Sequence, residues 1–113
     1  MNVMGFIRGL MSKNMDNESF FIRVAETVEA QLKEWDENYE VMVMKLKDYE
    51  FYVYRGETSC HVSISEQEAA ALQDKSPFSL DYKIWRSLEE QGLEVLSGYG
   101  DYIDKVYGRF RGD

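Results

Sequence analysis

The sequence predicts an α+β fold, in which an N-terminal helix packs on a three-stranded antiparallel β-meander and is followed by two helices and a short C-terminal element. Three observations predict this fold. Apolar residues recur at helical spacing before residue 36, three short runs of β-branched and aromatic residues come next, and signals for helix starts follow them. The chain of 113 residues has the length of one domain, and its single cysteine excludes an internal disulfide.

Residues 1–15 are predicted to be an apolar N-terminal segment that precedes a single α+β domain at residues 16–113. The segment is too short to span a bilayer, and Arg8 interrupts it. We expect a loose end or a short helix that packs on its own domain, because two glycines weaken the helix and its few basic residues attract anionic lipid only slightly. The alternative is contact with a partner or a membrane surface through residues 1–11. The apolar positions at helical spacing are Val3, Met4, Ile7, Leu10 and Met11.

The first long helix of the domain is expected to begin at a cap formed by Asp16 or Asn17 and to end near Trp35. Charged residues lie off its apolar stripe, so this helix should cover the core with one face. The stripe advances in steps of three and four residues and comprises Phe21, Val24, Ala25, Val28, Leu32 and Trp35.

Three antiparallel strands are expected at Tyr39–Lys47, Glu50–Arg55 and Thr58–Ile64, because the runs between them are short enough for hairpins. Side chains alternate between the two faces of a strand, so Tyr52 and Tyr54 should lie on the face opposite to Phe51 and Val53. The first two strands carry apolar or aromatic residues on both faces. Either the sheet is covered on both sides, or one face binds something.

Two helices are expected after the strands. Ser65 and Glu68 form a capping box for a short first helix. A second helix should start at Ser76-Pro77 or at Ser79 and should stop at Gly92. Residues 93–110 suit either a strand or a helix, since they combine helical apolar spacing with β-branched and aromatic residues.

Cys60 and His61, the only cysteine and the only histidine, are adjacent and raise the question of a nucleophile with its base or of a metal site. A nucleophile and its base must lie within roughly 3 Å of each other. Adjacent residues of a strand point to opposite faces, so these two side chains do not serve one another. A zinc site commonly needs about four Cys or His ligands, and this chain offers one of each. We therefore expect Cys60 on the core side and His61 on the opposite face.

The remaining sequence gives no catalytic or cofactor-binding signature. Phosphate-binding glycine motifs and a nucleophile elbow are absent. The predicted protein is therefore not an enzyme, uses no cofactor and no metal, and lies in the cytoplasm. Its formal net charge of −8 disfavours nucleic acid, since phosphate contacts need clustered bases.

Aromatic residues are the feature with the best claim to function, because Tyr, Trp and Met are enriched at protein interfaces. We expect a small acidic protein that acts as a non-catalytic protein-interaction domain, binding a protein partner or itself. The alternative is a nucleic-acid-binding regulator that uses a helix-turn-helix-like segment at residues 66–110, in which two helices are followed by a wing hairpin. The candidate interaction surface comprises Tyr52, Tyr54, His61, Tyr82 and Trp85.

Overall fold

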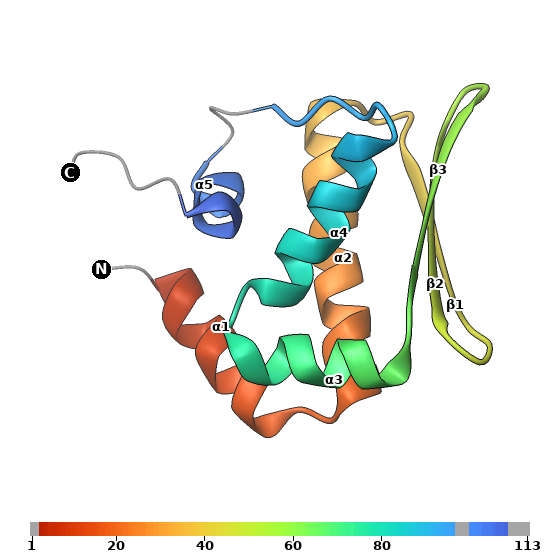
Figure 1. Ribbon diagram of the computed structural model, residues 1–113. Coiled ribbons are helices and arrows are strands. Elements are labelled where there is room, and N and C mark those ends of the chain that lie inside the picture. The colour runs from red at the N-terminus through yellow and green to blue at the C-terminus, as the bar shows by residue number, and fades with distance from the viewer. Residues whose placement is uncertain (1–2, 97–99, 109–113) are drawn as a thin grey trace.

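A computed structural model describes residues 3–96 and 100–108, with side chains from residue 7 onward (Figure 1). It confirms the predicted α+β class and the predicted order of helix, meander and helices. The elements are α1 (Val3–Asn14), α2 (Asn17–Trp35), β1 (Glu40–Lys45), β2 (Tyr49–Arg55), β3 (Thr58–Ile64), α3 (Glu66–Lys75), α4 (Ser79–Glu90) and α5 (Tyr102–Tyr107).

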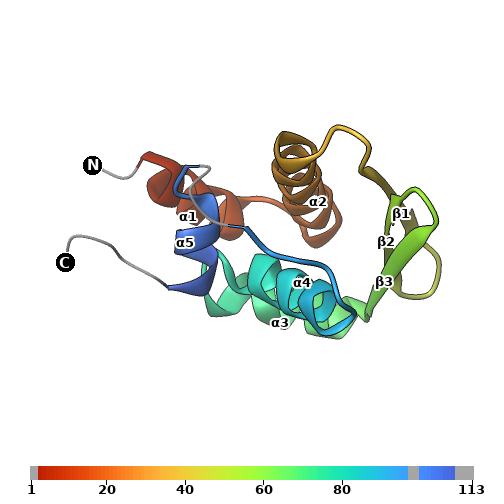
Figure 2. The same ribbon diagram turned by 90° about the horizontal axis from the view of Figure 1, so that it is seen from above.

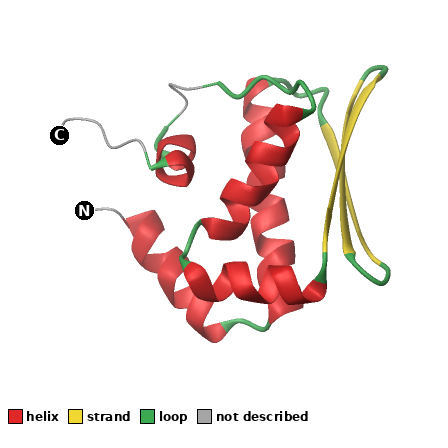
Figure 3. Cartoon of the chain, viewed as in Figure 1, coloured by secondary structure: helices red, strands yellow, loops and turns green. Residues whose placement is uncertain are grey.

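The three strands form one antiparallel sheet in the order β1-β2-β3. All the helices lie on one side of this sheet, as the two perpendicular views show (Figures 1 and 2). Colouring by secondary structure makes the division clear: the strands form one layer and the helices fill the space behind it (Figure 3). No described helix therefore covers the second face of the sheet, which answers the question left open by the apolar residues on both faces of β1 and β2.

Helix α2 packs its apolar stripe against the covered face of the sheet, as its sequence predicts. Asp16 caps the helix by accepting a hydrogen bond from the Ser19 N–H. Phe21 on this helix stacks on Tyr49 of β2 with 4.5 Å between ring centroids. The fully buried side chains of the helix are Phe20, Phe21, Val24, Val28 and Leu32.

Helices α3 and α4 form at the positions that the sequence predicts. The Ser65 side chain accepts a hydrogen bond from the Glu68 N–H at 3.0 Å, as expected for the N-terminus of α3. Helix α4 begins at Ser79 without a side-chain cap and ends before Gly92, whose φ of 102° favours glycine.

The described residues after α4 include a helix, α5. Residues 93–96 are not strand, and residues 102–107 form α5, with Gly108 in the left-handed conformation at its C-terminal end. Within the described part of the chain, α4 is thus followed by no hairpin, and the predicted wing is wrong in that part. Residues 102–107 form a helix rather than a strand because Tyr102, Ile103 and Val106 then bury one short amphipathic face against the other helices.

A buried ion pair joins α1 to the rest of the domain. Arg8 donates to the carboxylate of Asp81 in α4 and also lies 3.4 Å from the carbonyl oxygen of Pro77. Tyr102 donates its hydroxyl to the other Asp81 oxygen, at 2.5 Å, and accepts from the indole N–H of Trp85 at 3.1 Å. Helix α1 is therefore held by a polar contact in addition to apolar packing, and Arg8 is buried within that contact rather than facing solvent.

Candidate functional site

The candidate site is the uncovered face of the sheet, which we call the outer face. Strand alternation places one set of side chains on it from all three strands, and the register brings Met42, Tyr52 and His61 into one row across the sheet. The side chains on the outer face include Met42, Met44, Glu50, Tyr52, Tyr54, His61 and Ser63.

Three flat rings stack on the outer face. Tyr52 lies parallel to His61 with ring centroids 4.4 Å apart, and parallel to Tyr54 at 6.2 Å. Tyr54 is 37% exposed and the neighbouring Met42 is 42% exposed. The sheet therefore presents solvent with a patch of aromatic and thioether surface, of the composition that is enriched at protein interfaces.

A hydrogen-bonded pair of ionisable groups fixes the His61 ring. His61 Nε2 lies 2.5 Å from Glu50 Oε1, and the Ser63 hydroxyl donates to Glu50 Oε2 at 3.0 Å. The hydrogen bond from His61 is the main cause that lowers the pKa of Glu50 below its usual value, and Ser63 adds to this effect. His61 thus contacts both Tyr52 and Glu50 of β2, and its ring is held parallel to the Tyr52 ring.

Replacing His61 with alanine is expected to raise the pKa of Glu50, because the largest lowering contribution is then lost. A carboxyl group whose pKa is lower in the folded state stabilises the fold above its unfolded-state pKa, and this stability is lost as the pH falls through the folded-state pKa. His61→Ala should therefore make the unfolding free energy less dependent on pH in the acid range. Titration of the Glu50 carboxyl carbon by NMR checks this. An unchanged Glu50 pKa would contradict it.

Cys60 lies on the face opposite to His61, as predicted, between the sheet and the helical layer. Burial raises the pKa of its thiol. The thiolate is the nucleophilic form of cysteine, so this environment disfavours reactivity. The side chains of Cys60 and His61 therefore do not act on one another, although the two residues are adjacent in sequence.

The other predicted surface residues do not join the outer face. Trp85 is 0% exposed, so its assignment to an interaction surface is wrong. It packs between Trp35 and Tyr102 in the core. Tyr82 is exposed, but it lies on α4 against Tyr107 of α5, away from the sheet.

Sequence reasoning missed Gln91, whose side chain occupies the free edge of β3. Its carboxamide oxygen accepts from the His61 N–H at 2.9 Å, and its amide group donates to the His61 carbonyl oxygen at 2.7 Å. These are the two backbone groups that an added strand would use. Gln91 follows α4 directly, and no signal in the sequence marks it for this contact.

Metal sites and membrane-spanning helices are the two other kinds of feature that the sequence raises. The described residues contain no cluster of three or more His, Cys, Asp or Glu side chains arranged to hold a metal ion. They also include no helix whose length and apolar character would let it cross a membrane. Comparison with protein-family models, with curated proteins and with solved structures finds no match to this chain.

Proposed function

We propose that this chain is a protein-interaction domain that assembles with a second copy of itself through the free edge of β1. The observation that carries the proposal is the difference between the two edges of the sheet. At the β3 edge, Gln91 satisfies both backbone groups of His61. At the β1 edge, no described strand pairs with the side of β1 that faces away from β2.

The composition of β1 suits an added strand. Edge strands that resist pairing do so through charged side chains, proline or a bulge. The central residues Val41–Met44 carry none of these, and their register with β2 is continuous. Charged side chains stand only at the two ends of the strand, at Glu40 and Lys45.

Two copies of β1 match one another when they run antiparallel. Opposite residues of such a pair lie on the same face of the sheet, so only two central registers keep both sets of faces aligned. One places Val43 opposite Val43 of the second copy and Met42 opposite Met44. The other places Met42 opposite Met42 and Val41 opposite Val43. Both produce a six-stranded sheet with a continuous valine row inside and a continuous methionine and tyrosine patch outside.

The cytoplasm is the proposed location of this assembly. The free Cys60 and the absence of any other cysteine fit a reducing compartment. The net charge of −8 keeps the molecules soluble, so association depends on short-range backbone and side-chain contacts.

The double substitution Met42→Glu with Met44→Glu is expected to convert the dimer to monomer, because like charges then meet across the junction in both registers. Sedimentation equilibrium at tens of micromolar protein measures the change. Backbone hydrogen exchange adds a second measurement: the β1 amides should become better protected as the protein concentration rises, and those of β3 should not.

The control is Ala30→Glu with Ala71→Glu, which adds the same charge at two exposed helix positions away from the sheet. This variant should keep the dimer. A wild-type chain that sediments as a monomer would sink the proposal. So would a dimer that survives the β1 substitutions, or one that Tyr54→Ser abolishes, since Tyr54 lies on the outer face and outside β1.

The alternative function in nucleic-acid binding gains no comparable support. Asp81, at the start of the proposed recognition helix, is fully buried and faces Arg8 and Tyr102. The basic side chains of this region gather around a pocket instead, and the pocket supports a different inference.

A further inference from the structure

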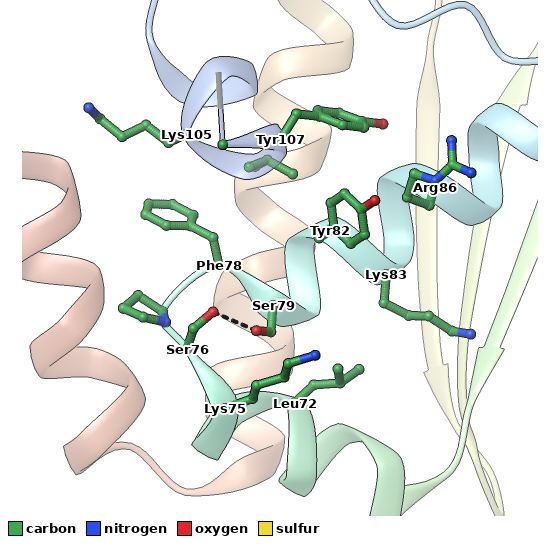
Figure 4. A pocket seen from close by; sticks show the side chains of 13 residues that line it. Leu72, Lys75, Ser76, Phe78, Ser79, Tyr82, Lys83, Arg86, Lys105 and Tyr107 are labelled. Carbon is green, nitrogen blue, oxygen red and sulfur yellow. Dashed lines mark hydrogen bonds between the residues drawn. The ribbon is translucent and has the colours of Figure 1, made fainter. Parts of the chain in front are cut away.

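A pocket of about 570 Å³ opens between the end of α3, the start of α4, and α5 (Figure 4). This volume lies within the range of about 300–1,000 Å³ that is usual for small-molecule sites. Its apolar lining comes from Leu72, Pro77, Phe78 and Val106. Tyr82 and Tyr107 stand beside each other at the pocket, edge to face, with centroids 5.5 Å apart.

The charge of this pocket is opposite to that of the whole protein. Its charged lining residues are Lys75, Lys83, Arg86 and Lys105, and none of the described residues that line it is acidic. The chain as a whole has a net charge of −8. Four bases therefore surround one apolar hollow, and their positive charge attracts a small anion that displaces the acidic partners of Lys83 and Arg86.

Lys83 and Arg86 have acidic partners that a ligand can replace. Lys83 lies 3.5 Å from Glu68, and Arg86 lies 3.0 Å from Glu89. Both pairs are well exposed, and exposed ion pairs are weak. Exchange of such a partner for the anionic group of a ligand costs little free energy.

Two serine hydroxyl groups that line the pocket suit the same ligand. Ser76 and Ser79 hold their hydroxyl oxygens 2.5 Å apart at the turn between α3 and α4. Helix α4 starts at this turn without a side-chain cap, so the positive end of its dipole adds to the effect of the four bases.

We propose that this pocket binds a small ligand with a flat aromatic body and one anionic group, a phosphate or a carboxylate. The aromatic body lies against Tyr82 and the apolar lining, and the anionic group lies among the lysines and the serine hydroxyls. This site is independent of β1 and goes beyond the proposed self-association.

The test uses 1-naphthyl phosphate, 1-naphthoate, 1-naphthol and inorganic phosphate as probes, with the amide resonances of the full chain as the readout. We expect 1-naphthyl phosphate or 1-naphthoate to shift the resonances of Ser76, Ser79, Tyr82 and Lys83 in a saturable way. The one that binds more tightly identifies the anionic group. Naphthol, which lacks the charge, and phosphate, which lacks the ring, should each bind at least about tenfold more weakly.

Matched variants locate the charge that is responsible. Lys75→Gln and Lys83→Gln should each weaken binding about three- to fivefold. Lys47→Gln removes the same charge from an exposed position after β1 and should leave the affinity unchanged. Equal binding of naphthol, equal weakening by Lys47→Gln, or no saturable shift at the pocket would overturn the proposal. It would also be overturned if a single-stranded oligonucleotide shifted the same resonances with higher affinity, since that result would assign the bases to nucleic acid.

Discussion

Replacing Asp81 with alanine is expected to lower the free energy of unfolding by about 3–5 kcal/mol. Asp81 is 0% exposed, and Arg8, its ion-pair partner, is buried as well. The substitution leaves the Arg8 guanidinium in the interior without a counter-charge, and it removes the acceptor of the Tyr102 hydroxyl. A domain of this size has a total stability of about 5–15 kcal/mol, so much of it depends on this one carboxylate.

Urea unfolding followed by circular dichroism measures this effect. Asp74→Ala is the matched control, because it removes an exposed carboxylate from α3 and should change the stability by less than about 0.5 kcal/mol. An Asp81→Ala variant as stable as this control would show that Arg8 finds solvent when its partner is lost, and would contradict the prediction.

A double-mutant cycle separates the attraction between Arg8 and Asp81 from the cost of burying them. Arg8→Met leaves the buried Asp81 carboxylate without a counter-charge, and Asp81→Leu leaves the buried Arg8 guanidinium without one. The double variant leaves no unpaired charge at this position, so its loss of stability should be smaller than the sum of the two single losses. Strictly additive losses would mean that the two groups do not interact.

Trp85→Ala is the second substitution with a large expected effect, again a loss of about 3–5 kcal/mol. Trp85 fills the core between Trp35 and Tyr102, and its indole N–H donates to the Tyr102 hydroxyl. The smaller side chain leaves a cavity and removes that hydrogen bond. Helices α4 and α5 should loosen together, because Trp85 and Asp81 both hold Tyr102.

The control for Trp85 lies on the same helix. Tyr82→Ala removes an aromatic ring that is 45% exposed, and should cost well under half as much. Denaturant unfolding of the two variants, measured side by side, decides the point. Similar losses of stability at the two positions would contradict the prediction, which rests on the burial of Trp85 and the exposure of Tyr82.

The outer face could be predicted because strand periodicity is a local property. Alternation along β2 and β3 sufficed to place Tyr52, Tyr54 and His61 on one face and Cys60 on the other. That this face is uncovered could not be predicted, because it depends on where the helices pack after the chain has turned back.

Helix α4 shows why Trp85 was misplaced. Its most regular apolar line, Leu80, Ile84 and Leu88, suggests a helix that is buried on one narrow stripe. Asp81 and Trp85 form a second line, one residue further along, and this line is buried as well. Asp81 made the second line look solvent-facing. Its partner Arg8 lies 73 residues away in sequence, and no local pattern connects them.

The one-sided arrangement of the fold also determines how the protein can be attached to a support. Helices α1 and α5 lie on the far side of the helical layer from the sheet (Figure 1). A short rigid tether at the first turn of α1 or the last turn of α5 would hold the molecule with its sheet directed away from the support. When the molecule is immobilised in this orientation, β1 and the outer face are both accessible to a second molecule in solution. A tether at the turn between β1 and β2 would instead shield them.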